Sequence, residues 1–548
     1  MVWEDLNLSE KLNPHEAEDI TWDVIVVGSG MGGGPLGHAL AQSGRRVLFL
    51  EKGRSTLPGV PGTIRSSIPE VAEPLACRSA NAYHDTLARA GRTTDDVEDL
   101  SGRTPRRYLP GTGSGTGGSS ALYGMVCERF FTQDFTPRQH FRNPRDSTVP
   151  DAWPITYDEM RPWYAAAERL LRVHGQPDPL RPEATDVGLP AAPPFSASSQ
   201  RLVDYLSGRG LHPYHLPMAC DHIDGCSDCN GYLCGRSCKN EAARNFLLPA
   251  TTEHGAHLLT ECRVVRLDAD GRQVRQVICQ HRTRQLTFRG KVVVLAAGAL
   301  FTPMLLLNSR SGDWPRGLAN GSDLVGRNLM RHLIDFIVIW PQPGSELTGD
   351  NRQIGLNDFY LLDGEKYGTV QSGGPLAPIE ALINHPGWQF KVMRLISPAA
   401  RPIYERFFEG ALQWPAILED LPYLDNRVLP SPAGRQQLRL QYRLHPGEIE
   451  RRTTFLRHLK EVFEPLRNLT LRGATSNAVL SHACGTCRFG IDPKTSVLDP
   501  HNRAHELDNL YVVDASFFPS STGINPSLTI AANALRTAEH VNQAHFAD

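Results

Sequence analysis

The sequence lacks the features of nucleic-acid-binding, secreted and membrane-spanning proteins. Its 57 Lys and Arg residues are balanced by 59 Asp and Glu residues, without a long basic run, so we expect no nucleic-acid partner. The N-terminus does not show the basic start and apolar stretch of a secretory signal. The most apolar stretch, residues 291–308, is interrupted by Gly298 and Pro303, and we expect no membrane span.

Internal repeats and low-complexity tails are also missing. Without a secretory signal we expect a cytoplasmic location, where the eleven cysteines are thiols or metal ligands rather than disulfides. The 48 glycines and 41 prolines are spread along the chain and indicate tight turns rather than disorder. A chain of 548 residues is longer than a single hydrophobic core can accommodate, so two packed domains are expected.

A strand–helix–strand unit is predicted near the N-terminus. Val24–Val27 is a short apolar run suited to a buried parallel strand, a helix follows at Leu36–Gln42, and Val47–Leu50 is a second such run. Further strands are expected at Leu258–Leu267 and Lys291–Leu295. This alternation is typical of a parallel sheet with crossover helices.

The turn inside that unit has the pattern of a dinucleotide site. Gly28, Gly30 and Gly33 form G-x-G-x-x-G between strand and helix. Gly28 permits the tight turn, and Gly30 lets the backbone approach a pyrophosphate at the helix N-terminus. Glu51 ends the second strand, where its carboxylate can accept the ribose hydroxyls.

Two further segments favour FAD over NAD. A second glycine-rich stretch spans Gly111–Gly124, and Asp514 ends a predicted C-terminal strand, Leu510–Val513, ahead of a helix from about Ser527. One nucleotide would then be held by both ends of the chain. Between them, residues 335–475 alternate apolar and polar in places, as at Leu438–Leu444, which predicts a half-exposed antiparallel sheet.

The ordered set of motifs resembles the glucose–methanol–choline oxidoreductases. Besides the N-terminal unit it comprises GTGGSSALYGMVCERF, WPITYDEMRPWYAAAE, VVVLAAGALFTPMLLLNS, LVGRNLMRH at Leu324–His332, HACGTCRFG at His482–Gly490 and the C-terminal block. The resemblance implies an α/β (α+β) fold, with a Rossmann-like FAD domain of glutathione-reductase type and a substrate domain built on an antiparallel sheet. The expected order is FAD domain 20–130, substrate or lid segment 131–200, FAD domain 201–335 with a cysteine loop at 220–238, substrate domain 336–475, and FAD domain 476–548.

The resemblance also implies the residues that contact FAD. They are Gly28, Gly30, Gly33, Glu51, Gly117, Gly118, Ser119, Val264, Asp514, Ala515, Asn525, Pro526 and Ser527. Tyr123 stands where the family usually has Asn, so some contacts differ. Leu122 stands where some members tether the flavin through His, so non-covalent FAD is expected.

The same resemblance places the chemistry at His482 and Asn525. Alcohol oxidation needs a base for the hydroxyl proton while hydride leaves for flavin N5, and a histidine suits that task because its pKa lies near working pH. His482 matches the family's catalytic histidine, and Asn525 matches its partner, whose amide orients the substrate oxygen.

These residues predict FAD-dependent oxidation of an alcohol on a sugar, aminoglycoside or other polyol. The electron acceptor would be O2, a quinone or a redox protein. The alternatives are an O2-using oxidase of a hydrophobic or aromatic alcohol, an FAD-containing lyase, and a non-catalytic electron-transfer flavoprotein.

A cysteine-rich segment, Cys220–Cys238, leaves three interpretations open. Cys226, Cys229, Cys234 and Cys238 follow C-x2-C-x4-C-x3-C, which would suit an iron–sulfur cluster, structural zinc, or a loop of packed thiols. In some sugar dehydrogenases of the resembling family, C-x4-C-x3-C holds a three-iron cluster, although a further cysteine there is replaced here by Asp228. Cys484 and Cys487, beside His482, are expected to be packed thiols.

Overall fold

The structure is a computed structural model. It describes residues 13–56, 63–66, 80–142, 144, 146–181, 183, 188–226, 229–340, 352–374, 376, 401–433, 435–480 and 482–547. Asp228 lies outside these residues, as do parts of each of the five predicted segments and the first twelve residues. Among the described residues, no helix is both long and apolar enough to cross a lipid bilayer.

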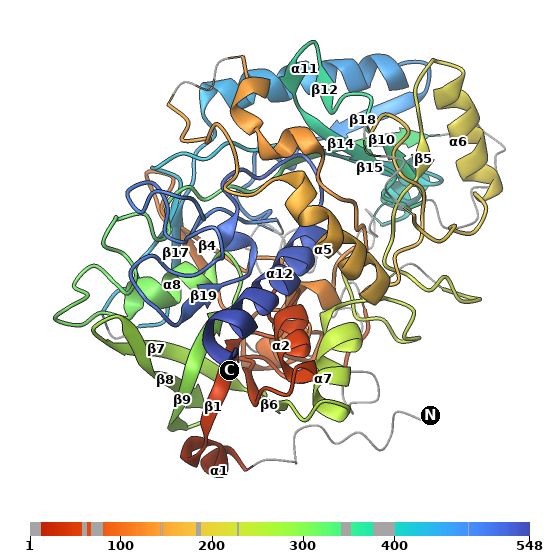
Figure 1. Ribbon diagram of the computed structural model, residues 1–548. Coiled ribbons are helices and arrows are strands. Elements are labelled where there is room, and N and C mark those ends of the chain that lie inside the picture. The colour runs from red at the N-terminus through yellow and green to blue at the C-terminus, as the bar shows by residue number, and fades with distance from the viewer. Residues whose placement is uncertain are drawn as a thin grey trace.

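A seven-stranded sheet joins strands from three distant parts of the chain (Figure 1). Its order is β6–β2–β1–β9–β8–β7, and β19 also pairs with β9. The strands are β1 Thr21–Val27, β2 Val47–Leu50, β6 His257–Leu259, β7 Cys262–Asp270, β8 Gln273–His281, β9 Arg284–Leu295 and β19 Leu510–Val512. The N-terminal strands β1 and β2 therefore share a sheet with the C-terminal strand β19.

The core of this sheet is parallel and buried on both faces. β6, β2, β1, β9 and β19 pair in parallel, whereas β7, β8 and the first part of β9 form an antiparallel meander. All four residues of β2 are buried, which explains its continuous apolar run. The strand predicted over Leu258–Leu267 is wrong in one respect, because the chain turns at Glu261, with φ of 53°, and separates β6 from β7.

Helices from both ends of the chain cover this sheet. α12 (Ser527–Phe546) packs against α2 (Gly33–Gln42) and α5 (Tyr157–Leu170), as Figure 1 shows at the centre of the molecule. α2 begins three residues earlier than predicted, at the last glycine of the turn. Within the described residues, the further α-helices are α1 Pro14–Asp19, α4 Ala80–Arg89, α6 Ala197–Ser207, α7 Leu248–Thr252, α8 Phe301–Asn308 and α11 Pro446–Phe463.

A second, six-stranded sheet has the order β18–β10–β15–β14–β11–β5, and all of its pairs are antiparallel. Its strands are β5 Tyr214–His215, β10 Leu333–Trp340, β11 Ile354–Leu356, β14 Gly368–Gln371, β15 Leu412–Leu418 and β18 Arg467–Leu471. α11 lies over this part of the molecule, at the top of Figure 1, and buries Phe455, Leu459 and Phe463 in the same apolar core. The predicted combination of a Rossmann-like sheet with an antiparallel sheet is confirmed.

The alternating stretch at Leu438–Leu444 does not belong to that antiparallel sheet. It forms β17 (Leu438–Gln441) in a four-stranded sheet with β16 Arg427–Leu429, β3 Val97–Asp99 and β4 Arg106–Tyr108. β17 is half-buried as predicted, but it pairs in parallel with β3, a strand more than 300 residues away in sequence. Periodicity reports exposure and does not identify the pairing partner. A two-stranded ribbon, β12 Leu361–Leu362 and β13 Glu365–Lys366, completes the strands.

Candidate active site

A cavity of about 510 Å³ is lined by residues of both large sheets. Val27 and Leu50 contribute from the carboxyl ends of the parallel strands, where ligands of open α/β sheets bind. Gln371 on β14 and Ile417 on β15 contribute from the antiparallel sheet. The cavity therefore extends from the place expected for a nucleotide to the antiparallel sheet.

The first glycine turn forms one wall of the cavity. Gly28 has φ of 99°, and a Cβ at this position would collide with the carbonyl oxygen of Ala296. Gly30 lines the cavity, whereas Gly33 lies behind it, where a Cβ would strike the carbonyl oxygen of Gly28. The turn thus brings backbone N–H groups and the N-terminus of α2 to the cavity, an arrangement that attracts phosphate.

Glu51 is held rigidly at the end of β2. Its carboxylate accepts hydrogen bonds from the Ser29 hydroxyl (2.7 Å) and from the backbone N–H groups of Gly53 (2.9 Å) and Gly115 (3.2 Å). The side chain is buried yet lines the cavity. Because Ser29 and Gly115 both donate to the Glu51 carboxylate, this side chain connects the first glycine turn with the second glycine-rich stretch.

The second glycine-rich stretch lies opposite the first. Gly118 and Ser119 line the cavity, and Gly117 lies behind it, with φ of 83°. Leu122 and Tyr123 also line it, and the Tyr123 hydroxyl donates a hydrogen bond to the carbonyl of Asn240. A buried alkyl side chain at Leu122 offers no atom that could form a covalent bond to a flavin.

Asp514 follows β19 and connects three segments. Its carboxylate accepts hydrogen bonds from the Gly298 N–H (2.9 Å), the Thr302 hydroxyl (2.5 Å) and the Ser516 N–H (2.9 Å). Burial raises its pKa, and these donors oppose the rise. Ala515, Pro526 and Ser527 line the adjoining wall, so the N-terminus of α12 points at the cavity. Val264 also lines the cavity.

A short antiparallel contact places His482 beside a second histidine. Met330 and Cys484 form an isolated bridge, with N–H···O distances of 3.0 and 2.9 Å. His332 follows Met330 by two residues, and His482 precedes Cys484 by two residues on the opposing segment. In an antiparallel pair these two positions face each other, so the two side chains lie on the same face. Their Nδ1 atoms are 2.9 Å apart. Cys484 and Cys487 are buried without a disulfide, as expected.

The hydrogen-bond chain defines the tautomers of both histidines. His332 Nε2 lies 3.1 Å from the carbonyl oxygen of Ser521, which can only accept a hydrogen bond, so Nε2 carries the hydrogen. His332 Nδ1 is then an acceptor, and His482 Nδ1 donates to it. Nε2 of His482 therefore keeps a free lone pair, and His482 lines the cavity.

Both histidines are held neutral. Burial, and secondarily the positive charge that His332 would carry, lowers the pKa of His482 to about 3. Burial likewise lowers the pKa of His332 to about 4. An unprotonated imidazole at ordinary pH is what a general base requires.

Asn525 lines the same cavity as His482. Its side-chain oxygen accepts a hydrogen bond of 2.5 Å from the Gln371 amide, which fixes the orientation of the Asn525 amide. The Nδ2 hydrogens are then the ones available to an oxygen in the cavity. The structure thus brings a neutral imidazole and an amide donor from two separate motifs to one cavity.

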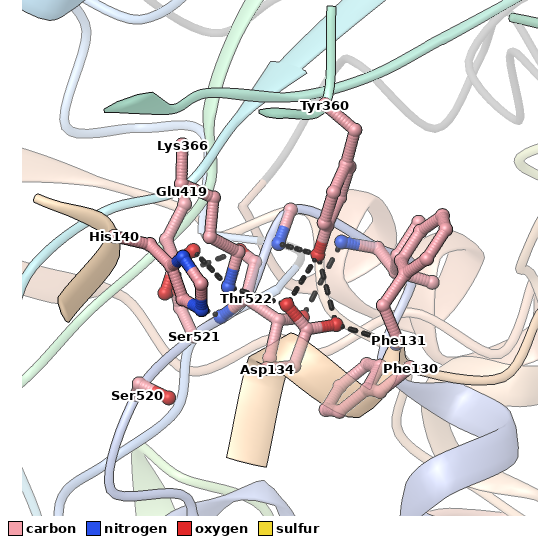
Figure 2. A network of polar contacts seen from close by, with 12 residues as sticks. Phe130, Phe131, Asp134, His140, Tyr360, Lys366, Glu419, Ser520, Ser521 and Thr522 are labelled. Carbon is pink, nitrogen blue, oxygen red and sulfur yellow. Dashed lines mark hydrogen bonds and ion pairs between the residues drawn. The ribbon is translucent and has the colours of Figure 1, made fainter. Parts of the chain in front are cut away.

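A buried ionic network contacts the loop that contains Ser521 (Figure 2). Lys366 is fully buried, with Asp134 and Glu419 (2.6 Å) as ion-pair partners. Glu419 accepts the Thr522 N–H at 3.1 Å, and the Gly523 N–H donates to the Tyr360 hydroxyl at 3.1 Å. The network therefore anchors the loop whose Ser521 carbonyl orients His332.

Sequence reasoning missed several of these residues. His332 ends the quoted LVGRNLMRH motif, yet no local signal there indicates a contact with His482. Gln371, Lys366 and Glu419 lie in stretches without a motif. Only their three-dimensional neighbours show what they do.

The cysteines of residues 220–238 group differently from the predicted set. The sulfurs of Cys220, Cys226 and Cys238 all lie within 4.8 Å of one another, and Cys234 is 3.5 Å from Cys238. Cys229 is buried and contacts Cys234. Cys220, outside the predicted ligands, thus belongs to the compact group.

The fold and the cavity define an FAD-dependent oxidoreductase. The sequence profile of GMC oxidoreductases matches residues 31–334 with its N-terminal part and residues 423–534 with its C-terminal part. The chain belongs to the GMC oxidoreductase family, and it is an FAD-dependent alcohol oxidoreductase.

The chain is also similar to individual proteins over most of its length. The chain is 31% identical to paromamine 6'-oxidase of Streptomyces fradiae, over 96% of this chain and 92% of the relative. It is 25% identical to 2-methyl-1,2-propanediol dehydrogenase of Mycolicibacterium austroafricanum, over 96% of each chain. The crystal structure of pyridoxine 4-oxidase from "Mesorbium loti" is similar in fold, with a TM-score of 0.62, 21% identity and coverage of 95% of this chain and 99% of that one.

Proposed function

We propose that the protein oxidises a neutral, polyhydroxylated alcohol, such as a sugar or sugar-like polyol, with non-covalently bound FAD and His482 as the base. The observation that carries this proposal is the Ser521–His332–His482 chain, which leaves a lone pair on Nε2 of a neutral histidine at the cavity. An electron-transfer flavoprotein would not need such a base.

We propose separate roles for the residues that would hold FAD and for the residues that would contact the alcohol. Glu51 and the N-terminus of α2 would hold the nucleotide part of FAD, and Leu122 would contact it without a covalent bond. When bound, FAD supplies the hydride acceptor. His482 Nε2 takes the hydroxyl proton, while the Asn525 amide donates to the oxygen and keeps the alcohol oriented.

The proposed substrate class rests on the polar side chains of the cavity that His482 lines. Gln371, which contacts Asn525, lines this cavity together with Ser372 and Gln413, and all three offer amide or hydroxyl groups to substrate hydroxyls. Among the described lining residues the carboxylates are Glu51 and Asp514, which are engaged at the cofactor end. A neutral polyol therefore fits better than a polycation. One relative is named for a diol, 2-methyl-1,2-propanediol.

Anaerobic reduction of the flavin across a substrate panel tests the proposal. The panel contains neutral sugars, sugar alcohols, paromamine, 2-methyl-1,2-propanediol, an aromatic alcohol and a fatty alcohol. We expect bleaching with the neutral polyols. Bleaching by paromamine alone would refute the neutral class, and bleaching only by the apolar alcohols would refute the polyol class. A flavin that stays oxidised while a substrate is cleaved would indicate a lyase.

The electron acceptor is identified by measuring how fast the same reduced protein is reoxidised. Mixing it with O2, a soluble quinone or a redox protein gives three reoxidation rates to compare. Acid precipitation followed by absorbance of the supernatant tests the mode of attachment. We expect all of the FAD in the supernatant, and yellow precipitate would contradict non-covalent binding.

A further inference from the structure

Five cysteines in residues 220–238 form a continuous series of sulfur contacts. The Sγ atoms of Cys220 and Cys226 are 3.7 Å apart, those of Cys226 and Cys238 are 3.3 Å apart, and those of Cys234 and Cys238 are 3.5 Å apart. Cys229 touches Cys234 at the end of the series. Among the described residues no pair of cysteines is bonded as a disulfide.

The separations among Cys220, Cys226 and Cys238, whose sulfurs all lie within 4.8 Å of one another, match thiolates that share a single metal ion. Zinc binds sulfur at about 2.3 Å, so two sulfurs of a tetrahedral site lie about 3.8 Å apart. In a cubane-type iron–sulfur cluster each thiolate binds a different iron atom, which separates the sulfurs by the width of the cluster. A disulfide would require about 2.05 Å. The observed spacing is too long for a disulfide and too short for such a cluster.

We propose that Cys220, Cys226, Cys234 and Cys238 bind one zinc ion as thiolates. Cys220, Cys226 and Cys238 form the compact group, and Cys234, outside that group but 3.5 Å from Cys238, would complete the set by a small side-chain movement. Binding releases the four thiol protons and changes no oxidation state. Cys229 lies outside the ligand set and touches the Cys234 sulfur.

The surroundings suit a site of net negative charge. Lys239, next to Cys238, is buried, and its ammonium donates to the carbonyl oxygens of Ala121 (3.1 Å), Tyr123 (3.1 Å) and Tyr232 (2.9 Å). Four thiolates around Zn²⁺ carry a net charge of about −2. The cation of Lys239, which follows Cys238 directly in the sequence, would offset part of that charge.

The proposed zinc site would stabilise the loop that forms one wall of the cavity. The Gly231 N–H donates to the Leu122 carbonyl at 2.7 Å, and Gly231 and Asn230 both line the cavity. Lys239 binds the neighbouring carbonyls of the second glycine-rich stretch. A zinc ion with four protein ligands has no open position for chemistry, so its expected role is to fix this loop against the FAD site.

Metal analysis and zinc-edge X-ray absorption of the purified holoenzyme test the proposal. We expect one zinc per chain, with four sulfur neighbours at about 2.3 Å. Iron with acid-labile sulfide would overturn the proposal in favour of a cluster. A metal-free protein, with a Cys226–Cys238 disulfide or with free thiols, would overturn it as well.

Two single substitutions separate the proposed ligands from the neighbouring cysteine. Cys220→Ser should lose the zinc, whereas Cys229→Ser should keep it. The opposite result would return the ligand set to the one expected from spacing. Because Cys220→Ser can fail to fold, X-ray absorption on the wild type and on Cys229→Ser decides independently, since a drop in sulfur neighbours for Cys229→Ser would make Cys229 a ligand.

Discussion

The Nδ1 atoms of His332 and His482 lie 2.9 Å apart, and this contact determines which nitrogen of His482 is basic. The Ser521 carbonyl sets the tautomer of His332, and His332 sets the tautomer of His482. One backbone carbonyl thus controls the orientation of a lone pair two side chains away. In this arrangement His332 is a positioning residue and His482 is the group that would touch substrate.

His482→Ala should retain FAD and lose flavin-reduction rate by roughly two to four powers of ten, the usual contribution of a general base. Asn525→Ala should lose less, because it orients the oxygen rather than accepting the proton. Stopped-flow reduction under anaerobic conditions measures both. Wild-type rates in His482→Ala would show that another group is the base.

His332→Phe should move the acid limb of the flavin-reduction rate to higher pH. Burial and His332 lower the pKa of His482 to about 3, so the wild-type base stays neutral and active well below pH 6. Phenylalanine cannot carry the positive charge of a protonated His332, so the pKa of His482 rises and its protonated, inactive form accumulates at a higher pH.

His332→Gln is the matched control for that experiment. Its side-chain oxygen can accept the His482 Nδ1 hydrogen, so it should restore part of the rate at neutral pH. A purely structural role for His332 would lower the rate equally at every pH, and a pH profile parallel to the wild type would contradict our interpretation.

Lys366→Met should destabilise the protein by about 3–5 kcal/mol, because Asp134 and Glu419 would remain buried without their cation. Lys494→Met, at an exposed lysine, should change stability by no more than about 0.5 kcal/mol. Thermal unfolding of the two variants measures the difference. Equal melting temperatures would mean that the network contributes little.

Gly28→Ala should purify with far less FAD than the wild type, because the new methyl group would collide with the Ala296 carbonyl and the φ of 99° disfavours any side chain. Gly188→Ala is the control, since a Cβ there meets nothing within 4 Å. The ratio of flavin to protein absorbance reports both. Full flavin content in Gly28→Ala would contradict the proposal that this glycine turn holds FAD.

Sequence alone determined the local elements and the family. The apolar runs of β1 and β2 and the glycine turn between them depend on residues close together in the chain, and they form as predicted. His482 and Asn525 were predicted as the catalytic pair because each lies inside a recognisable motif, and the structure places both on one cavity. The α/β fold with an added antiparallel sheet followed from the order of the motifs.

Only the tertiary structure decided the partners of those residues. His332 and His482 are 150 residues apart, and their contact exists because one backbone bridge, at Met330 and Cys484, aligns the two segments. Likewise Cys220 joins Cys226 and Cys238, whereas spacing favoured Cys229. Local patterns record which residues are apolar, turn-forming or reactive. Contacts across long loops depend on how the whole chain packs, and single-sequence spacing contains no measure of that.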